Sequence, residues 1–261
     1  MVKKVLVLFG LIFLFSSISH GWERFNRNKN VSVSIGVMEI IRVWEYKIGE
    51  ITFGPNGLEI SKVKTGKTRE KLSGGSGSGT VISRDGLILT CDHVINDVDP
   101  GIISRRNKSI TVRVDINGAS KTYKAEVVAS DPLNDIAIIK INRSFKSPAR
   151  LGQKNQIKQG AWFYNWGYPL ANLVSPGRGI TYNSGYIRNI SYKILSYNSP
   201  RVLSSMQAIG GMSGSSVFGH DGKIIGMVEA GILSNYSYFD SVFIPIDQIR
   251  AVIKRNKIRL R

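Results

Sequence analysis

Three of the Asx-Gly pairs, each lying between two runs of β-prone residues, are the feature that most restricts the fold of this chain. They occur at 85–86, 117–118 and 221–222. Asn-Gly and Asp-Gly favour the left-handed backbone that tight two-residue turns require, so each pair predicts an antiparallel β-hairpin. Both halves of the chain are therefore expected to contain antiparallel sheet.

The rest of the chain continues this β-rich pattern. Further strand-like runs occur at 31–43, 136–141, 161–166, 185–190 and 241–244. Helical periodicity is convincing only near the C-terminus, where Ile249, Val252 and Ile253 share one helix face. Asp247 precedes them in the chain and is a suitable N-cap. The polar and basic stretch 142–160 is typical of a connection between two β units. We therefore predict an all-β protein of two antiparallel domains, closed by one helix.

The N-terminus has the pattern of a secretory signal peptide. A basic start is followed by an apolar run at 5–15 and by small residues near a plausible cleavage point. This run is shorter than the roughly 20 residues that span a bilayer, so we favour a signal peptide over 1–19, cleaved near Ser19. The alternative is an N-terminal membrane anchor. The favoured interpretation predicts a secreted or periplasmic protein.

The chain is strongly basic and has a single cysteine. Its 261 residues carry a formal net charge of +18, and Cys91 has no second cysteine with which to form an internal disulfide. Such charge attracts anionic surfaces or polymers, whereas the alternative is a solvated surface kept soluble by repulsion. We favour the second interpretation, because no basic motif interleaved with aromatic residues accompanies the charge. For the same reason we expect no specific nucleic-acid partner.

A serine enclosed by glycines is the strongest candidate for chemistry. The segment 211–214 reads Gly-Met-Ser-Gly and places Ser213 between two apolar runs. Glycine on both sides lets the chain turn sharply, present the serine Oγ and aim successive N–H groups at one point. Short motifs of this kind are also common in surface turns, so the interpretation depends on finding a base and an acid.

His93 is the base that elimination leaves. The chain has three histidines. His20 lies at the signal-peptide junction, and His220 lies at the tip of a predicted hairpin. His93 instead follows directly after a predicted strand, where it can accept the proton of a serine hydroxyl.

Asp135 is the carboxylate expected to orient that histidine, since it lies at the head of an apolar strand-like run. Asp92 is the local alternative, but neighbouring side chains of an extended segment point to opposite faces. Asp131 is the second alternative. With Asp135 the chain order is His93, Asp135, Ser213, which is the order of the chymotrypsin arrangement.

Three ordered segments resemble the trypsin-like serine peptidases, most closely the bacterial HtrA/Deg-type protease domain. They are Gly-Ser-Gly-Thr-Val at 77–81 running on to His93, the aspartate run at 131–141, and the serine segment 211–217 with its following hairpin. The resemblance covers about 74–255. It implies two six-stranded β-barrels with the catalytic residues His93, Asp135 and Ser213 in the cleft between them.

The same resemblance implies further roles and limits. It places an oxyanion hole at the backbone N–H groups of Gly211 and Ser213. Together with the signal peptide at 1–19, we predict an N-terminal strand and extension at 20–73, a first barrel at 74–146 and a second barrel with the helix at 147–261. The substrate would be a polypeptide. We expect no cofactor and no metal, and no PDZ domain, because Arg261 ends the chain soon after the second barrel.

The serine segment departs from the family pattern at Met212, Ser215 and Ser216, where a polar residue, a glycine and a proline are usual. Cys91 precedes His93 where small or polar residues are usual, and we interpret it as a buried thiol. These departures keep open an alternative function, a protease-fold protein with weak or no activity that captures an anionic partner. Glu229 lies near the expected S1 pocket and is a candidate to bind a basic substrate side chain, or else to pair with a cation of the protein itself.

Overall fold

The computed structural model describes residues 26–54, 57–96, 102–116, 119–169, 179–194, 199–233 and 239–260. The predicted signal peptide and His20 lie outside these ranges. None of the described helices is long and apolar enough to cross a membrane.

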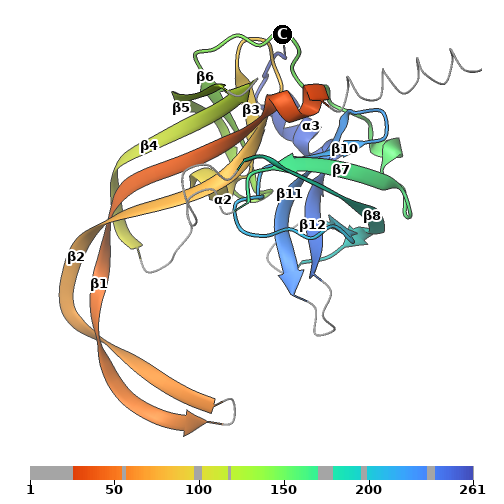
Figure 1. Cartoon of the computed structure of the whole chain (residues 1–261). Coiled ribbons are helices and arrows are strands. Elements are labelled where there is room, and N and C mark those ends of the chain that lie inside the picture. Colours follow the sequence, from red (N-terminus) through yellow and green to blue (C-terminus); the bar gives the residue numbers. More distant parts are fainter. Residues whose placement is uncertain are drawn as a thin grey trace, which may run out of the picture.

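Two closed antiparallel barrels of six strands each form the body of the protein (Figure 1). The first contains β1 (Ser32–Gly54), β2 (Gly57–Val81), β3 (Leu87–Thr90), β4 (Ile102–Ile116), β5 (Ala119–Asp131) and β6 (Ile136–Ile141). The second contains β7 (Trp162–Gly167), β8 (Thr181–Tyr192), β9 (Arg201–Ser204), β10 (Ser216–Gly219), β11 (Ile224–Leu233) and β12 (Phe239–Pro245). The barrels close in the orders β1-β2-β3-β6-β5-β4 and β10-β11-β12-β9-β8-β7, so the predicted fold class is confirmed.

Besides the helical residues 26–31, the described strands are accompanied by α2 (Asp92–Ile95), the 3-10 turn η1 (Lys154–Gln156) and α3 (Ile246–Arg255). The helix predicted at the C-terminus is α3, and its buried face includes Ile249, Val252 and Ile253 as expected. The predicted N-cap is wrong, because Pro245 occupies that position and Asp247 lies in the first turn. A carboxylate there still suits the positive end of the helix dipole, and it pairs with Lys154 at 2.8 Å.

Apolar side chains join the two barrels and the closing helix into one core. The same buried cluster contains Ile139 of β6, Phe218 of β10 and Ile249 of α3. A second cluster fills the interior of the second barrel, where the rings of Phe163 and Phe243 meet edge to face with centroids 5.5 Å apart. This shared packing holds the barrels against each other and fixes the relative positions of loops that come from both.

The predicted hairpins at 85–86 and 221–222 connect β2 to β3 and β10 to β11. Gly86 shows why the turn needs glycine, since its φ is +91° and a Cβ would lie 2.5 Å from the Ile141 carbonyl oxygen. The third turn, 117–118, lies outside the described residues, but β4 and β5 pair up to Ile116 and Ala119 on either side.

The first hairpin is much longer than the sequence pattern indicated. The predicted strand at 31–43 continues to Gly54, and β2 returns from Gly57, so both belong to the first barrel and also extend away from it as an arm (Figure 1). Strand β9 and helix α2 were not predicted. The domain limits 20–73, 74–146 and 147–261 stay predictions.

Candidate active site

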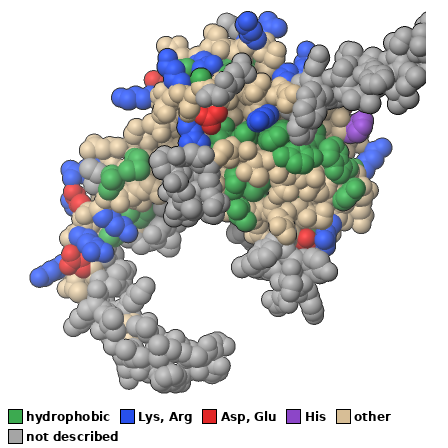
Figure 2. All heavy atoms as spheres, viewed as in Figure 1, with side chains coloured by type: hydrophobic (Ala, Val, Ile, Leu, Met, Phe, Trp, Pro, Cys, Tyr) green, Lys and Arg blue, Asp and Glu red, His purple; other side chains and the backbone are tan. Residues whose placement is uncertain are grey.

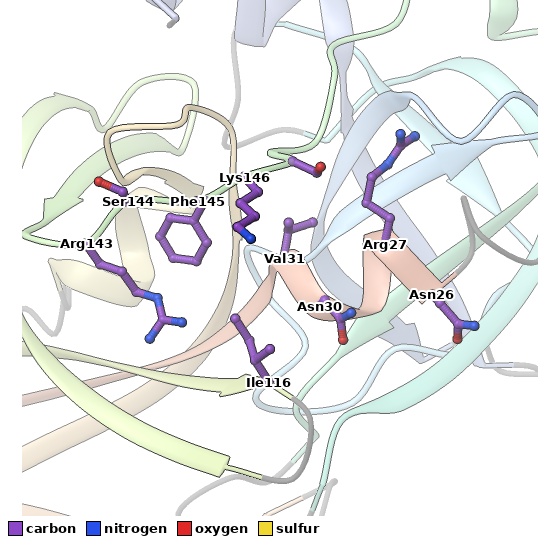
Figure 3. A pocket seen from close by; sticks show the side chains of 10 residues that line it. Asn26, Arg27, Asn30, Val31, Ile116, Arg143, Ser144, Phe145 and Lys146 are labelled. Atoms are coloured by element: carbon purple, nitrogen blue, oxygen red, sulfur yellow. The ribbon is translucent and has the colours of Figure 1, made fainter.

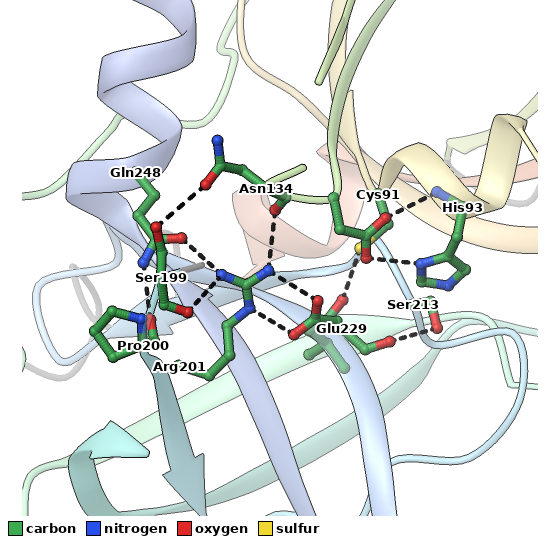
Figure 4. A network of polar contacts seen from close by, with 11 residues as sticks. Cys91, His93, Asn134, Ser199, Pro200, Arg201, Ser213, Glu229 and Gln248 are labelled. Carbon is green, nitrogen blue, oxygen red and sulfur yellow. Dashed lines mark hydrogen bonds and ion pairs between the residues drawn. The ribbon is translucent and has the colours of Figure 1, made fainter. Parts of the chain in front are cut away.

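The register of β3 against β6 brings His93 to Asp135. These strands pair antiparallel with Thr90 opposite Ala137, so the end of one meets the start of the other. Asp135 Oδ2 lies 2.7 Å from His93 Nδ1, and Oδ1 accepts a hydrogen bond from the His93 backbone N–H at 2.8 Å (Figure 4). The carboxylate therefore fixes both the ring and the backbone of the histidine.

The carboxylate of this pair is buried, whereas the imidazole is accessible. Asp135 is 3% exposed, whereas the His93 side chain is 39% exposed. Burial lowers the pKa of His93, but the hydrogen bond to Asp135 and the charge of that carboxylate outweigh it, so the pKa lies above its ordinary value. Asp135 itself has a positive φ of 56°, a conformation that aspartate tolerates better than most residues.

Ser213 lies on the loop between β9 and β10 and lines the same hollow as His93, a cavity of about 580 Å³. The other wall of this hollow is formed by residues 228–232 of β11. In this structure the Ser213 Oγ donates to the Glu229 carbonyl at 2.8 Å (Figure 4). The hydroxyl is thus directed at β11 and not at the His93 ring.

Positive φ angles shape the serine loop on both sides. Gly211 has φ +90° and Gly214 has φ +88°, and a Cβ on Gly214 would lie 2.2 Å from the Ser78 carbonyl oxygen. Within the described residues the backbone N–H groups of Gly211 and Ser213 donate no hydrogen bond. Two donors that remain available beside a serine hydroxyl are the arrangement that stabilises an oxyanion.

Ser78 contacts the serine loop, and the sequence interpretation did not single it out. Its N–H donates to the Ser213 carbonyl at 2.8 Å and its Oγ donates to the Gly211 carbonyl at 2.7 Å, so β2 of the first barrel holds the loop of the second. The Ser78 Oγ also accepts the Tyr168 N–H at 2.9 Å. The only sequence signal was its place in the Gly-Ser-Gly segment at 77–79.

Comparison with known proteins identifies the family. The family model described as trypsin-like peptidase domain matches residues 77–227, more than half of the chain. This chain belongs to the trypsin-like peptidase family. The resemblance of this peptidase domain to the HtrA/Deg type is confirmed by its relatives.

Among the relatives of this trypsin-like peptidase domain is a DegP-like periplasmic serine endoprotease of Pseudomonas fulva, 29% identical over 62% of this chain and 30% of that protein. Another is the Do-like 14 protease of Arabidopsis thaliana, 33% identical over 69% of this chain and 41% of its own length. The chain thus spans well under half of these relatives. The crystal structure of Deg5 superposes with a TM-score of 0.60, covering 93% of this chain and 96% of that one at 20% identity, which is a likeness of fold.

The atypical residues of the serine segment are all buried, and the Ser216 Oγ has no hydrogen-bond partner among the described residues. Met212 is 3% exposed and belongs to the core of the second barrel. The Ser215 Oγ donates to the Met212 carbonyl at 2.6 Å and accepts from Asn165 Nδ2 at 2.9 Å. Strand β10 begins at Ser216. The departures at 212, 215 and 216 therefore leave the strand after Ser213 intact.

Glu229 does not offer its carboxylate to a substrate. It is 2% exposed, and its two oxygens accept from Arg201 Nε at 2.7 Å and Nη2 at 3.0 Å (Figure 4). Of the two roles that the sequence left open, pairing with a cation of the protein is the one that the structure contains. The fully buried Arg201 also donates to the carbonyl of Asn134 at 3.2 Å and to Gln248 Oε1 at 2.8 Å.

The two carboxylates considered as alternative partners of His93 bind other residues. Asp92 accepts from Ser130 Oγ at 2.6 Å and from Asn96 Nδ2 at 3.0 Å. Asp131 binds Arg255 and the Asn134 side chain. His220 is exposed on the β10–β11 turn.

Cys91 is fully buried beneath the site, where its Sγ lies 3.3 Å from the Val228 carbonyl. Ligand atoms of Cys91, His93 and Asp135 lie within 4.8 Å of one another, a spacing that a metal ion could bridge. Desolvation and then the charge of Asp135 raise the pKa of the Cys91 thiol well above its usual range. A protonated thiol must lose its proton before it binds a metal, so metal binding at this cluster would carry that cost.

Proposed function

We propose that this chain is an exported serine endopeptidase that uses Ser213, His93 and Asp135. The observation that carries the proposal is the pair of hydrogen bonds that Asp135 accepts from His93, beside a hollow that both His93 and Ser213 line. A buried carboxylate on Nδ1 leaves Nε2 as the accepting nitrogen of the neutral ring, which is the tautomer that a general base requires.

Catalysis begins with rotation of the Ser213 side chain. Its Oγ leaves the Glu229 carbonyl and donates to His93 Nε2, a contact that tightens when substrate binds. Ser213 then attacks the peptide carbonyl as His93 accepts the hydroxyl proton. His93 returns that proton to the leaving amine, and water hydrolyses the acyl-enzyme through the same base. The N–H groups of Gly211 and Ser213 stabilise the two oxyanions.

Arg201 and Glu229 act as positioning residues for this chemistry. Arg201 binds the carbonyl of Asn134, the residue directly before Asp135, while the backbone of its partner Glu229 holds the resting Ser213 hydroxyl. The pair connects β9 and β11 of the second barrel to the aspartate turn of the first. Its buried charges thereby support the alignment of residues contributed by both barrels.

The substrate class and location follow from the relatives and from the N-terminus. A polypeptide is the substrate expected of this family. The relative in Pseudomonas fulva is described as periplasmic, which agrees with export directed by the predicted signal peptide. We therefore place the proposed activity outside the cytoplasm.

Labelling by a fluorophosphonate tests the proposal. Mature protein should react, Ser213→Ala should not, and Ser120→Ala, which changes an exposed serine on β5, should react like the parent. Absence of labelling in folded parent protein would contradict the proposal. That result would favour the second candidate, an inactive binding protein, which the bond of Ser213 to the Glu229 carbonyl also accommodates.

A further inference from the structure

Two adjoining hollows lie away from the cleft. The larger, about 690 Å³, lies between the helical residues 26–31, the end of β4 and the segment 143–147 (Figure 3). The smaller, about 510 Å³, shares Arg27, Lys146 and Ser147 with it. We call the two together the basic groove, because their cationic lining residues are Arg27, Arg84, Arg143, Lys146, Arg150 and Arg250.

The groove and the cleft lie at opposite ends of the first barrel. Arg84 precedes β3 and His93 follows it, whereas Asp135 precedes β6 and Arg143 follows it. Strand β6 has six residues, and six extended residues span roughly 20 Å, so the groove and the cleft are separated by a distance of that order. In Figure 2, Lys and Arg side chains occur at the end of the molecule where residues 26–31 lie in Figure 1, as well as along the β1–β2 arm. A ligand in the groove therefore need not touch the catalytic residues.

The charge of the groove is not neutralised by the described part of the protein. Within the described residues, no Asp or Glu lines either hollow and none of the six cations forms an ion pair. The acidic residues nearest in sequence are paired outside the groove: Asp85 with Lys140, Asp115 with Arg113 and Asp247 with Lys154. Buried Nε atoms of Arg27 and Arg143 also have no hydrogen-bond partner in the described structure.

Neutral groups hold two of these guanidinium groups in place. Arg143 donates to the Tyr123 hydroxyl at 2.6 Å and lies 5.2 Å from the centre of the Phe145 ring. Arg250 donates to the carbonyls of Leu151 and Gly152. Aromatic rings and carbonyls position a guanidinium without cancelling its charge, so the cations are ordered before any anion arrives.

We propose that the basic groove binds a ligand that carries two or more phosphate groups along a short chain. Arginine matches phosphate oxygens in a bidentate geometry, and the combined hollows are large enough for a small molecule. Figure 3 shows Arg143, Lys146 and Arg27 spaced along the larger hollow, with Lys146 between the other two. Cations spread in a row suit successive anionic groups better than a single phosphate.

Titration calorimetry with inorganic tripolyphosphate tests this proposal on the mature chain. We expect saturable binding of one tripolyphosphate per protein and weakening by about tenfold or more in Arg84→Ser/Lys146→Ser, since each lost ionic contact weakens binding severalfold. The matched control is Arg69→Ser/Lys71→Ser, which removes one arginine and one lysine from exposed positions on the β1–β2 arm. Its affinity should stay within about twofold of the parent.

Each outcome decides the proposal. Equal weakening in both double variants would show a response to net charge alone and overturn the groove as the site, and so would absence of saturable binding. Vesicles of phosphatidylglycerol form a separate arm. If vesicles bind through Arg84 and Lys146 while tripolyphosphate does not bind, the ligand is a membrane surface and the oligophosphate proposal is overturned.

Discussion

The cleft and the basic groove use charge in opposite ways at the two ends of one barrel. In the cleft, Asp135 is bonded to His93, and the buried Glu229 is bonded to the buried Arg201. In the groove, six cations line a hollow with no carboxylate among the described lining residues. The difference is between charges that are satisfied by the fold and charges that the fold leaves for a ligand.

Burial explains why the two regions differ. A buried charge is stable only when a partner and hydrogen bonds replace its hydration, so each partner also fixes the position of the other. The groove cations are exposed or half-buried, so they keep at least part of their hydration and need no carboxylate partner within the protein. Single substitutions should therefore have large effects in the cleft and small effects on folding in the groove.

The largest effect is expected from Asp135→Asn. The change retains the size of the side chain but no longer stabilises the imidazolium or selects the productive tautomer of His93. We expect kcat to fall about 10⁴-fold, the size of the effect of this change in a Ser-His-Asp triad. Steady-state cleavage of a casein-type substrate would measure it, with circular dichroism to establish folding. A loss smaller than tenfold would mean that Asp135 does not orient the base.

Breaking the buried pair should have the next largest effect. Glu229→Gln leaves the Arg201 guanidinium buried without its counter-charge, and we expect a loss of about 3 kcal/mol in the free energy of unfolding. Urea denaturation measures it. Arg201→Met/Glu229→Leu removes both charges and should be less destabilised than the single variant. Equal stability of Glu229→Gln and the parent would show that the pair is not buried as described.

A positioning role predicts a further readout for this double variant. If Arg201 and Glu229 align the aspartate turn, kcat should fall in the folded double variant while KM changes little. A stable double variant with unchanged kcat would restrict the pair to a structural role. The comparison separates what the pair does for the fold from what it does for the chemistry.

The pH dependence of activity should change more modestly. Only neutral His93 is a base, so kcat/KM should rise with pH through the pKa of His93, which lies above the ordinary value of 6.5. Removing the Asp135 charge lowers that pKa, so the midpoint of the residual activity of Asp135→Asn should move to lower pH. A midpoint that does not move would mean that another group titrates.

The raised pKa of His93 also makes the free energy of unfolding depend on pH. Because the pKa of His93 is raised in the folded state, the protonated ring stabilises the fold fully at pH values below its unfolded pKa. That contribution is lost as the pH rises through the folded pKa. Urea midpoints measured across this interval should decline in the parent relative to Asp135→Asn, and parallel curves would contradict the assignment.

The smallest effect is expected in the groove. Arg84→Ser/Lys146→Ser removes two exposed cations without carboxylate partners, so the free energy of unfolding should change by less than about 0.5 kcal/mol. Any change at low ionic strength should be stabilising, because like charges repel, and salt should abolish it. Urea midpoints at low and high salt measure both. Destabilisation above about 1 kcal/mol would mean that these cations support the fold.

Local patterns predicted much of the fold. The Asp-Gly turns, the run 136–141 and the apolar face of α3 each depend on neighbours within a few residues, and each appears where it was expected. The length of the β1–β2 arm was not predictable in the same way. Trp44, Tyr46 and Ile48 alternate with charged residues, but this pattern does not show how far the two strands pair with each other.

The candidate site likewise contains residues that the sequence indicated and residues that only the structure revealed. His93, Asp135 and Ser213 were identified from residue type, order and family resemblance. Ser78 and Arg201 were not, because their roles consist of contacts with residues more than 60 positions away, Ser78 with Gly211 and Arg201 with Asn134. Sequence analysis left two roles open for Glu229 for the same reason, since its partner Arg201 lies on another strand.

The sequence by itself determined the all-β fold class, its hairpin turns and the three residues proposed for catalysis, because turn chemistry, alternation and motif order are properties of the chain. The tertiary structure alone decided which charges are satisfied. The pairing of Arg201 with Glu229, the hold of Ser78 on the serine loop and the gathering of six cations into one groove all arise from strand register and barrel packing. These bring together residues that no local pattern connects.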